Sequence, residues 1–201
     1  MKKILFVLFS LTVLTLPLSA GKFYQNDILG IKIQCPEGWY IIPGTKIEKG
    51  TKATFKDIAP TSSLKESVDR VGILVVFSKV PPGEPVEYAA NISLVREPIN
   101  TQYIKDSLRY AKSSILTIKQ VFKDVVITQQ PRGCTLSGLS ATNFEYEGTI
   151  VRGYLQTRIK SRVYLFLKGN FGYAITFTAL KEEFPLLVNK FEEVIKTFII
   201  K

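Results

Sequence analysis

The strongest constraint on the fold is a run of four successive β segments between residues 121 and 179, with no helical pattern between them. The segments are predicted at residues 121–127, 139–147, 151–168 and 173–179. Apolar and polar side chains alternate along them, which is typical of strands with one buried face. The third segment is long enough for one bent strand or for two. A Lys-Gly-Asn-Phe-Gly turn then reverses the chain before the last segment.

Two stretches with helical spacing lie on either side of this run. The first is predicted over residues 104–118 and the second over residues 184–198, each with its apolar residues on one stripe. Leu108 belongs to the first stripe, whereas Glu192 is expected outside the second stripe. Pro185 falls in the first turn of the second helix, where its missing N–H costs little. Each helix is expected to lay its apolar stripe on the sheet.

The first half of the chain adds further extended segments. Residues 29–35 and 39–42 are predicted as strands separated by a turn, and the apolar run at residues 71–77 is typical of a central strand covered on both faces. A weaker strand is predicted at residues 53–58, and residues 86–95 are predicted as a short helix or an irregular turn. Strands, a helix, strands and a closing helix together predict an α+β domain in which helices cover an antiparallel β-sheet.

Residues 1–20 have the three-part layout of a secretory signal peptide. Two lysines precede an apolar run over residues 4–16, and Ala20 offers a small residue at the cleavage position. The alternative is an uncleaved anchor, but the run is shorter than the roughly 20 apolar residues that span a bilayer. We therefore expect cleavage after Ala20, which leaves residues 21–201 as a single domain.

Export would place the mature chain in the periplasm or outside the cell. No cysteine lies near the expected cut, so attachment to lipid through a new N-terminal cysteine is not expected, and no second long apolar run predicts a further membrane span. The formal charge of +10 favours anionic partners such as lipid headgroups or acidic protein patches. Nucleic acid is not expected in that compartment. The alternative is that the lysines are simply solvated.

Two cysteines, Cys35 and Cys134, remain in the mature chain. An exported protein can keep a disulfide, and a bridge between them would close a loop worth up to about 4–5 kcal/mol in the chain-entropy model. Alternatively, each cysteine is a small buried apolar residue. The sequence leaves both interpretations open.

Catalytic patterns are weak in this chain. It contains no histidine, which excludes Ser-His-Asp and Cys-His arrangements and a zinc site completed by histidine. Ser161 with Lys160 could form a Ser-Lys pair, but neighbours in a strand point to opposite faces. Glu145 and Glu147 share one strand face, which suits glycoside chemistry or a solvated surface. We expect neither enzymatic activity nor a metal or cofactor.

The best candidate for a binding surface is a basic and aromatic stripe in the segment 151–168. Arg152, Tyr154, Arg158 and Lys160 are separated by even numbers of residues, so they would share one face of a regular strand. Such a stripe could contact an anionic partner or phospholipid headgroups. The alternative is a solvent-facing strand whose cations prevent edge-to-edge pairing.

Several short motifs resemble those of the PsbP-like domains. They are Pro36-Glu37-Gly38-Trp39 after the first strand, the strand from Gly138 to Tyr146, the segment from Gly172 to Ala179, and the helix end from Phe191 to Phe198. The resemblance covers most of residues 23–201 in order. It implies an antiparallel sheet in an α/β/α sandwich, in a family that includes a lumenal photosystem subunit, a nuclear Ran-binding factor and bacterial envelope proteins.

Of those roles, only the envelope role agrees with a signal peptide. The sequence therefore favours a non-enzymatic binding or assembly protein of the bacterial cell envelope that acts through protein–protein contacts. The alternative is a periplasmic carrier or sensor of a small apolar or anionic ligand held between the sheet and a helix.

Overall fold

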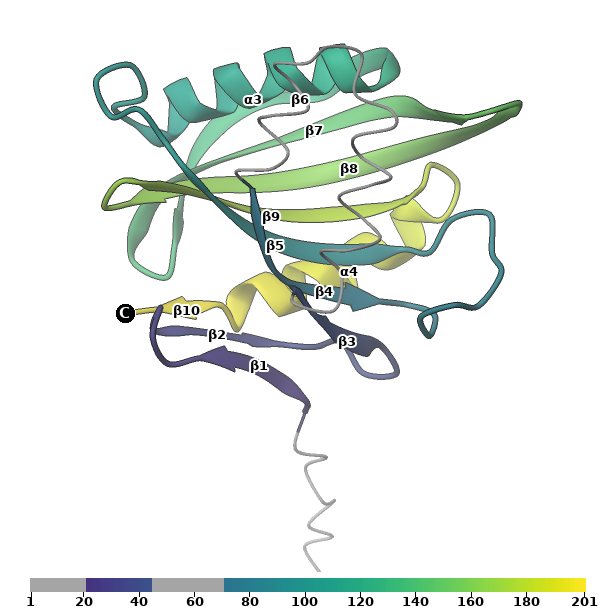
Figure 1. Ribbon diagram of the computed structural model, residues 1–201, viewed down its shortest axis with the longest axis horizontal. Helices are drawn as coiled ribbons and strands as arrows, with labels where there is room; N and C mark the ends of the chain where they lie inside the picture. Colours follow the sequence, from purple (N-terminus) through teal and green to yellow (C-terminus); the bar gives the residue numbers. More distant parts are fainter. Residues whose placement is uncertain (1–20, 45–70) are drawn as a thin grey trace, which may run out of the picture.

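The computed structural model describes residues 21–44 and 71–201. Within them the chain forms ten strands and two helices (Figure 1). In chain order the elements are β1 (Phe23–Asn26), β2 (Ile31–Gln34), β3 (Tyr40–Pro43), β4 (Gly72–Ser78), β5 (Asn91–Pro98), α3 (Ser107–Val121), β6 (Lys123–Leu136), β7 (Leu139–Arg152), β8 (Leu155–Lys168), β9 (Phe171–Leu180), α4 (Phe184–Lys196) and β10 (Ile199–Ile200). The weak strand predicted at residues 53–58 lies outside the described residues.

Seven strands form one antiparallel sheet in the order β3-β4-β5-β9-β8-β7-β6. Its larger part is a meander in which β6, β7, β8 and β9 each pair with the next strand in sequence. The three reversals are two-residue turns that contain Gly138, Gly153 or Gly169, each at positive φ, where other residues are strained. The four predicted β segments correspond to these four strands and the α+β fold class is confirmed, but the bounds are corrected: Val121 ends α3, and residues 151–152 end β7 rather than begin β8.

The large sheet lies between two layers (Figure 1). α3 packs on one face against β6, β7 and β8, whereas α4 packs on the other face against β9 and against β2 of a small sheet in the order β1-β2-β10. Within the part of the chain that the structure describes, neither helix is long and apolar enough to cross a membrane.

Each face of the sheet has its own hydrophobic core. Because successive strand residues point to opposite faces, β8 contributes Ile159 and Val163 to the α3 side and Phe166 to the α4 side. On the α4 side, Phe177 of β9 stacks on Phe191 of α4 with ring centroids 5.2 Å apart. The helical stripe predicted for α4 is confirmed.

Two local predictions for the first half of the chain are corrected. Residues 86–95 form neither a helix nor only a turn, because Asn91 begins β5, in which Ile92 and Leu94 are buried. Pairing with β4 on one side and β9 on the other fixes this strand, and a local sequence window does not show such pairing. The strand predicted at residues 71–77 is β4, but it lies one position from the sheet edge rather than at its centre.

α3 begins at Ser107, later than predicted, and Ala111, Ile115 and Ile118 of its predicted stripe pack on the sheet side. Tyr110 and Ala111 are buried, whereas Leu108 is exposed. The Tyr110 hydroxyl donates to Glu97 Oε1 at 2.7 Å, and its ring lies over Gly172, which is paired with Glu97. A Cβ atom at Gly172 would lie 2.6 Å from Tyr110 Cζ, so the close approach of α3 to β9 requires a glycine here.

We expect Gly172→Ala to lower the free energy of unfolding by about 1–3 kcal/mol, because the added methyl group displaces a buried ring. Gly133→Ala is the matched control, since Gly133 is also in a strand but has no positive φ and no atom within 4 Å of the place that an added methyl group would occupy. Urea denaturation would measure both. Equal effects of the two substitutions would show that the Tyr110 contact does not limit the packing of α3.

Candidate interaction surface

The basic and aromatic stripe predicted from the sequence is divided by a hairpin turn. Arg152 is the last residue of β7, Tyr154 lies in the turn, and Arg158 and Lys160 belong to β8. These four residues therefore do not lie along one regular strand. The glycine at position 153 was the available signal, because it marks the reversal inside the long segment 151–168.

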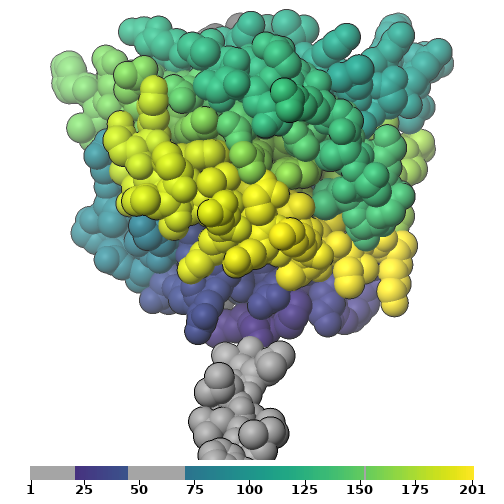
Figure 2. Space-filling model, turned by 180° about the vertical axis from the view of Figure 1, so that it is seen from behind, coloured from purple at the N-terminus to yellow at the C-terminus, as the bar shows by residue number. Residues whose placement is uncertain are grey.

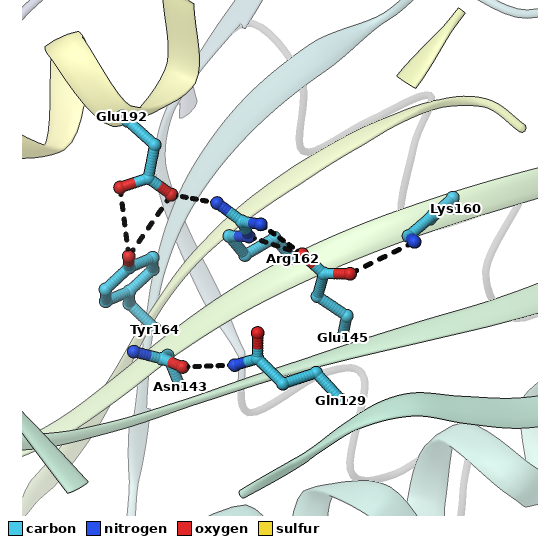
Figure 3. A network of polar contacts seen from close by, with 7 residues as sticks. All are labelled: Gln129, Asn143, Glu145, Lys160, Arg162, Tyr164 and Glu192. Carbon is cyan, nitrogen blue, oxygen red and sulfur yellow. Dashed lines mark hydrogen bonds and ion pairs between the residues drawn. The ribbon is translucent and has the colours of Figure 1, made fainter. Parts of the chain in front are cut away.

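Lys160 is not a free surface cation. It belongs to a polar network on the α4 side of the sheet, shown in Figure 3, which is centred on Glu145 of β7. Glu145 is only 7% exposed, and its carboxylate accepts hydrogen bonds from Arg162 Nε at 2.6 Å and contacts Lys160 Nζ at 3.1 Å. The pairing of β7 with β8 places Arg162 directly opposite Glu145.

The same network ties α4 to the sheet. Arg162 also pairs with Glu192 of α4, and the Tyr164 hydroxyl donates to the Glu192 carboxylate at 3.2 Å (Figure 3). Glu192 lies outside the apolar stripe of α4, as expected, but it is half-buried because it lies where α4 crosses the polar part of β8. On the same face, Gln129 of β6 donates to Asn143 of β7. Sequence reasoning missed Arg162, Tyr164 and Glu192 as members of one cluster.

The electrostatics of this network favour fixed, complementary charges. Burial raises the pKa of Glu145, but hydrogen bonds and charge from Arg162 and Lys160 outweigh this effect and hold that pKa below its ordinary value. Burial and the neighbouring Glu192 carboxylate raise the pKa of Tyr164 well above its ordinary value, so its hydroxyl remains a donor at neutral pH.

This arrangement suits structure better than acid–base catalysis. Glu145 and Glu147 do share the α4 face, as predicted, but Glu145 is neutralised by two cations and Glu147 pairs with Lys181 at 2.6 Å. The pKa of Glu145 is held below its ordinary value rather than raised toward neutrality, as a general acid requires. Among the described residues, no group of three or more acidic or cysteine side chains is placed to hold a metal ion.

The Ser-Lys pair drawn from the sequence does not assemble. Ser161 is fully buried on the α3 side and hydrogen-bonds Thr178 at 2.9 Å, whereas Lys160 lies on the α4 side with Glu145. Cys35 and Cys134 are free thiols in the structure; Cys35 belongs to the α4-side core, and Cys134 is partly buried against it. Burial raises the pKa of Cys35 to about 11, so its thiol is not a nucleophile at neutral pH.

The exposed part of the predicted stripe is the tip of the β7–β8 hairpin, which we define as residues 151–156. Tyr154 is fully exposed, Leu155 is 70% exposed and Val151 is also exposed. In Figure 1 this tip extends beyond the other strands of the sheet. The sequence had singled out Tyr154 here but missed the two aliphatic residues beside it.

Two hollows on the surface do not match the site expected for a carried ligand. One of about 340 Å³ is lined by residues 21–22 and 34–40, and another of about 220 Å³ by residues around the start of β5 and the end of β9. Neither is lined by a residue of α3. Between α3 and the sheet, the space is filled by Tyr110, Phe144, Tyr146 and their neighbours.

Removing the central cation of the network tests its contribution to stability. We expect Arg162→Met to lower the free energy of unfolding by about 2 kcal/mol, because Glu145 and Glu192 both lose a charged partner. Lys79→Met is the matched control, since it breaks the exposed pair with Glu183, which is worth less than about 1 kcal/mol. Urea titrations of the two variants would be compared, and a smaller loss for Arg162→Met would contradict this account.

The lowered pKa of Glu145 also predicts a pH dependence. A carboxyl with a folded-state pKa below its unfolded value stabilises the fold above the unfolded value, which is about 4.3 for glutamate, and loses this effect as pH falls through the folded-state pKa. The stability difference between wild type and Glu145→Gln should therefore be largest near neutral pH and shrink in acid. A difference that stays constant down to acidic pH would show that the charge of Glu145 is unimportant.

Comparison with known proteins identifies the fold. No protein-family model and no curated protein matches the sequence. The solution structure of cyanobacterial PsbP (CyanoP) from Synechocystis sp. PCC 6803 matches with a TM-score of 0.51 and 13% identity, over 90% of this chain and 92% of that one. LpqN, described as involved in cell envelope biogenesis of Mycobacterium tuberculosis, matches with a TM-score of 0.49 and 13% identity, over 90% and 86% of the two chains. The chain thus has the PsbP-like fold that its sequence motifs resemble.

Proposed function

We propose that this protein is an exported, non-enzymatic binding protein of the bacterial cell envelope that holds a protein partner with the tip of its β7–β8 hairpin. The observation that carries the proposal is the exposure of Val151, Tyr154 and Leu155 at that tip. The proposed export rests on the signal-peptide pattern of residues 1–20.

The strand register shows why these side chains have no place in the domain's own packing. β6 pairs with β7 only as far as Thr149, and β9 pairs with β8 only from Ile159 onward. The last rungs of the hairpin, residues 150–152 with 155–157, are paired only with each other among the described strands. A two-stranded ribbon that exposes apolar side chains gains little by itself, so a partner that buries them would stabilise it.

The chemistry of the tip fits a protein partner. Tyrosine supplies a large contact area at low cost in side-chain entropy, and it is enriched among the interface residues that contribute most of the binding energy. Arg158, exposed on β8 just behind the tip, and Lys123, exposed on β6, would form part of a charged rim around the apolar contact. The expected partner surface is therefore an apolar pocket with acidic residues at its edge.

A crosslinking experiment tests this function. The tagged full chain would be expressed in its native host, crosslinked in intact cells and purified, and the co-purified proteins identified. We expect one stoichiometric envelope protein with wild type and at least about tenfold less of it with Tyr154→Ser/Leu155→Ser, because the loss of two anchoring side chains removes more than about 1.4 kcal/mol of binding.

Tyr103→Ser/Leu186→Ser is the matched control, because it removes one exposed tyrosine and one exposed leucine elsewhere on the surface. Both double variants should unfold near the wild-type temperature. Recovery of the same partner with the tip variant and with the control would refute the hairpin as the binding site. Recovery of no stoichiometric protein by wild type would refute the binding function itself.

A further inference from the structure

The outer face of α3 carries positively charged side chains, and the helix itself contains no acidic residue. From residue 107 to residue 123 the chain contains no aspartate or glutamate. The cations of α3 are Arg109, Lys112 and Lys119, and all three are exposed. Asp106, just before the helix, accepts the backbone N–H of Arg109 at 2.7 Å as the N-cap. The charged side chains along the outer face of α3 are therefore all positive.

Exposed leucines lie among these cations. Leu108 is 42% exposed and Leu116 is 64% exposed, although other apolar residues of α3, such as Ala111, face the sheet. Leu108, Lys112 and Leu116 are spaced four residues apart, so they form one row along the helix. The helix thus has an apolar stripe on the sheet and a second, mixed apolar and cationic row on the outside. Figure 2 shows the α3 region across the top of the molecule, away from the N-terminal strands.

The other helix shows that this pattern is not a general property of the surface. α4 carries Lys190 and Lys196 together with Glu192 and Glu193, so its charges cancel. The cations in the ion pairs of the described residues are Lys79, Lys160, Arg162 and Lys181, and none of these is on α3. Within those ranges, the cations of α3 have no acidic partner.

We propose that the outer face of α3 docks on an anionic lipid surface. A membrane leaflet with anionic headgroups presents one sign of charge over a wide area, which matches a helix face whose cations are not balanced by acids. Leucines between the cations can enter the headgroup region while the lysine stems lie along it. Since the main apolar stripe of α3 stays on the sheet, the contact is peripheral and depends strongly on salt.

Vesicle sedimentation of the full chain tests this docking. The probes are vesicles of phosphatidylcholine alone and of phosphatidylcholine with phosphatidylglycerol. The apolar run of residues 4–16 can bind both kinds, so the measured quantity is the excess affinity for the anionic vesicles. We expect this excess to fall at least about fivefold in Lys112→Glu/Leu116→Gln, since each basic residue near the surface contributes about a factor of five.

Leu186→Gln/Lys196→Glu is the matched control, because it makes the same kinds of change on the exposed part of α4. Its excess affinity should equal that of wild type, and high salt should abolish the excess in both. If wild type binds neutral and anionic vesicles equally, or if the α3 and α4 variants behave alike, the proposal is wrong. Binding to the envelope protein sought above is a separate measurement, so either proposal can fail alone.

A fluorescence measurement covers the case in which the double variant does not fold. The single native tryptophan, Trp39, is buried, so a tryptophan placed on the surface gives a distinct signal. In Leu116→Trp the emission should shift to shorter wavelength when anionic vesicles are added, and in Leu186→Trp it should not. No shift at position 116, or an equal shift at both positions, would overturn the docking of α3.

Discussion

The structure depends on the burial of both faces of the β6–β9 meander. β8 shows this most directly, because Ile159 and Val163 belong to one core and Phe166 to the other. A strand that is apolar on both sides leaves one face in water unless a layer covers each face. α3 and α4 are therefore both required, and each must approach the sheet closely. Gly172 allows this for α3, and the aromatic stack between Phe177 and Phe191 provides it for α4.

The two faces of the sheet satisfy the polar groups beside their hydrophobic cores in different ways. On the α3 side, hydroxyl pairs such as Ser107 with Thr142 and Ser161 with Thr178 satisfy the polar groups inside the layer. On the α4 side, the ion-pair network around Glu145 takes over where the apolar contact between α4 and the sheet ends. The network engages Lys160 of the predicted basic stripe, whereas Arg158 stays exposed. What remains for a partner lies on the hairpin tip and on the outside of α3, both of which point away from the two cores.

The sequence predicted those parts of the fold in which the local pattern of apolar residues directly reflects burial in the whole domain. The alternation in the four β segments and the stripe of α4 both follow directly from burial, so they were recognised without knowledge of pairing. β5 was missed because its identity as a strand depends on β4 and β9 rather than on its own residues. The network was missed for a related reason, since only the register of β7 on β8 brings Arg162 opposite Glu145. The exposed hairpin tip could be recognised only from a single glycine turn, and apolar and polar residues alternate in the segment on both sides of that turn.

The small sheet has a consequence for the order in which the parts of the chain fold. β2 is completed by β10, and the Lys201 N–H donates to the Gly30 carbonyl at 3.0 Å. The pairing of residues near position 30 therefore requires residues near position 200. The meander forms from hairpins between neighbouring strands, whereas β2 gains its partner β10 only when two segments far apart in the sequence meet. Closure of such a long loop is slow compared with the formation of hairpins. The small sheet is therefore expected to close late in folding, after the meander has formed.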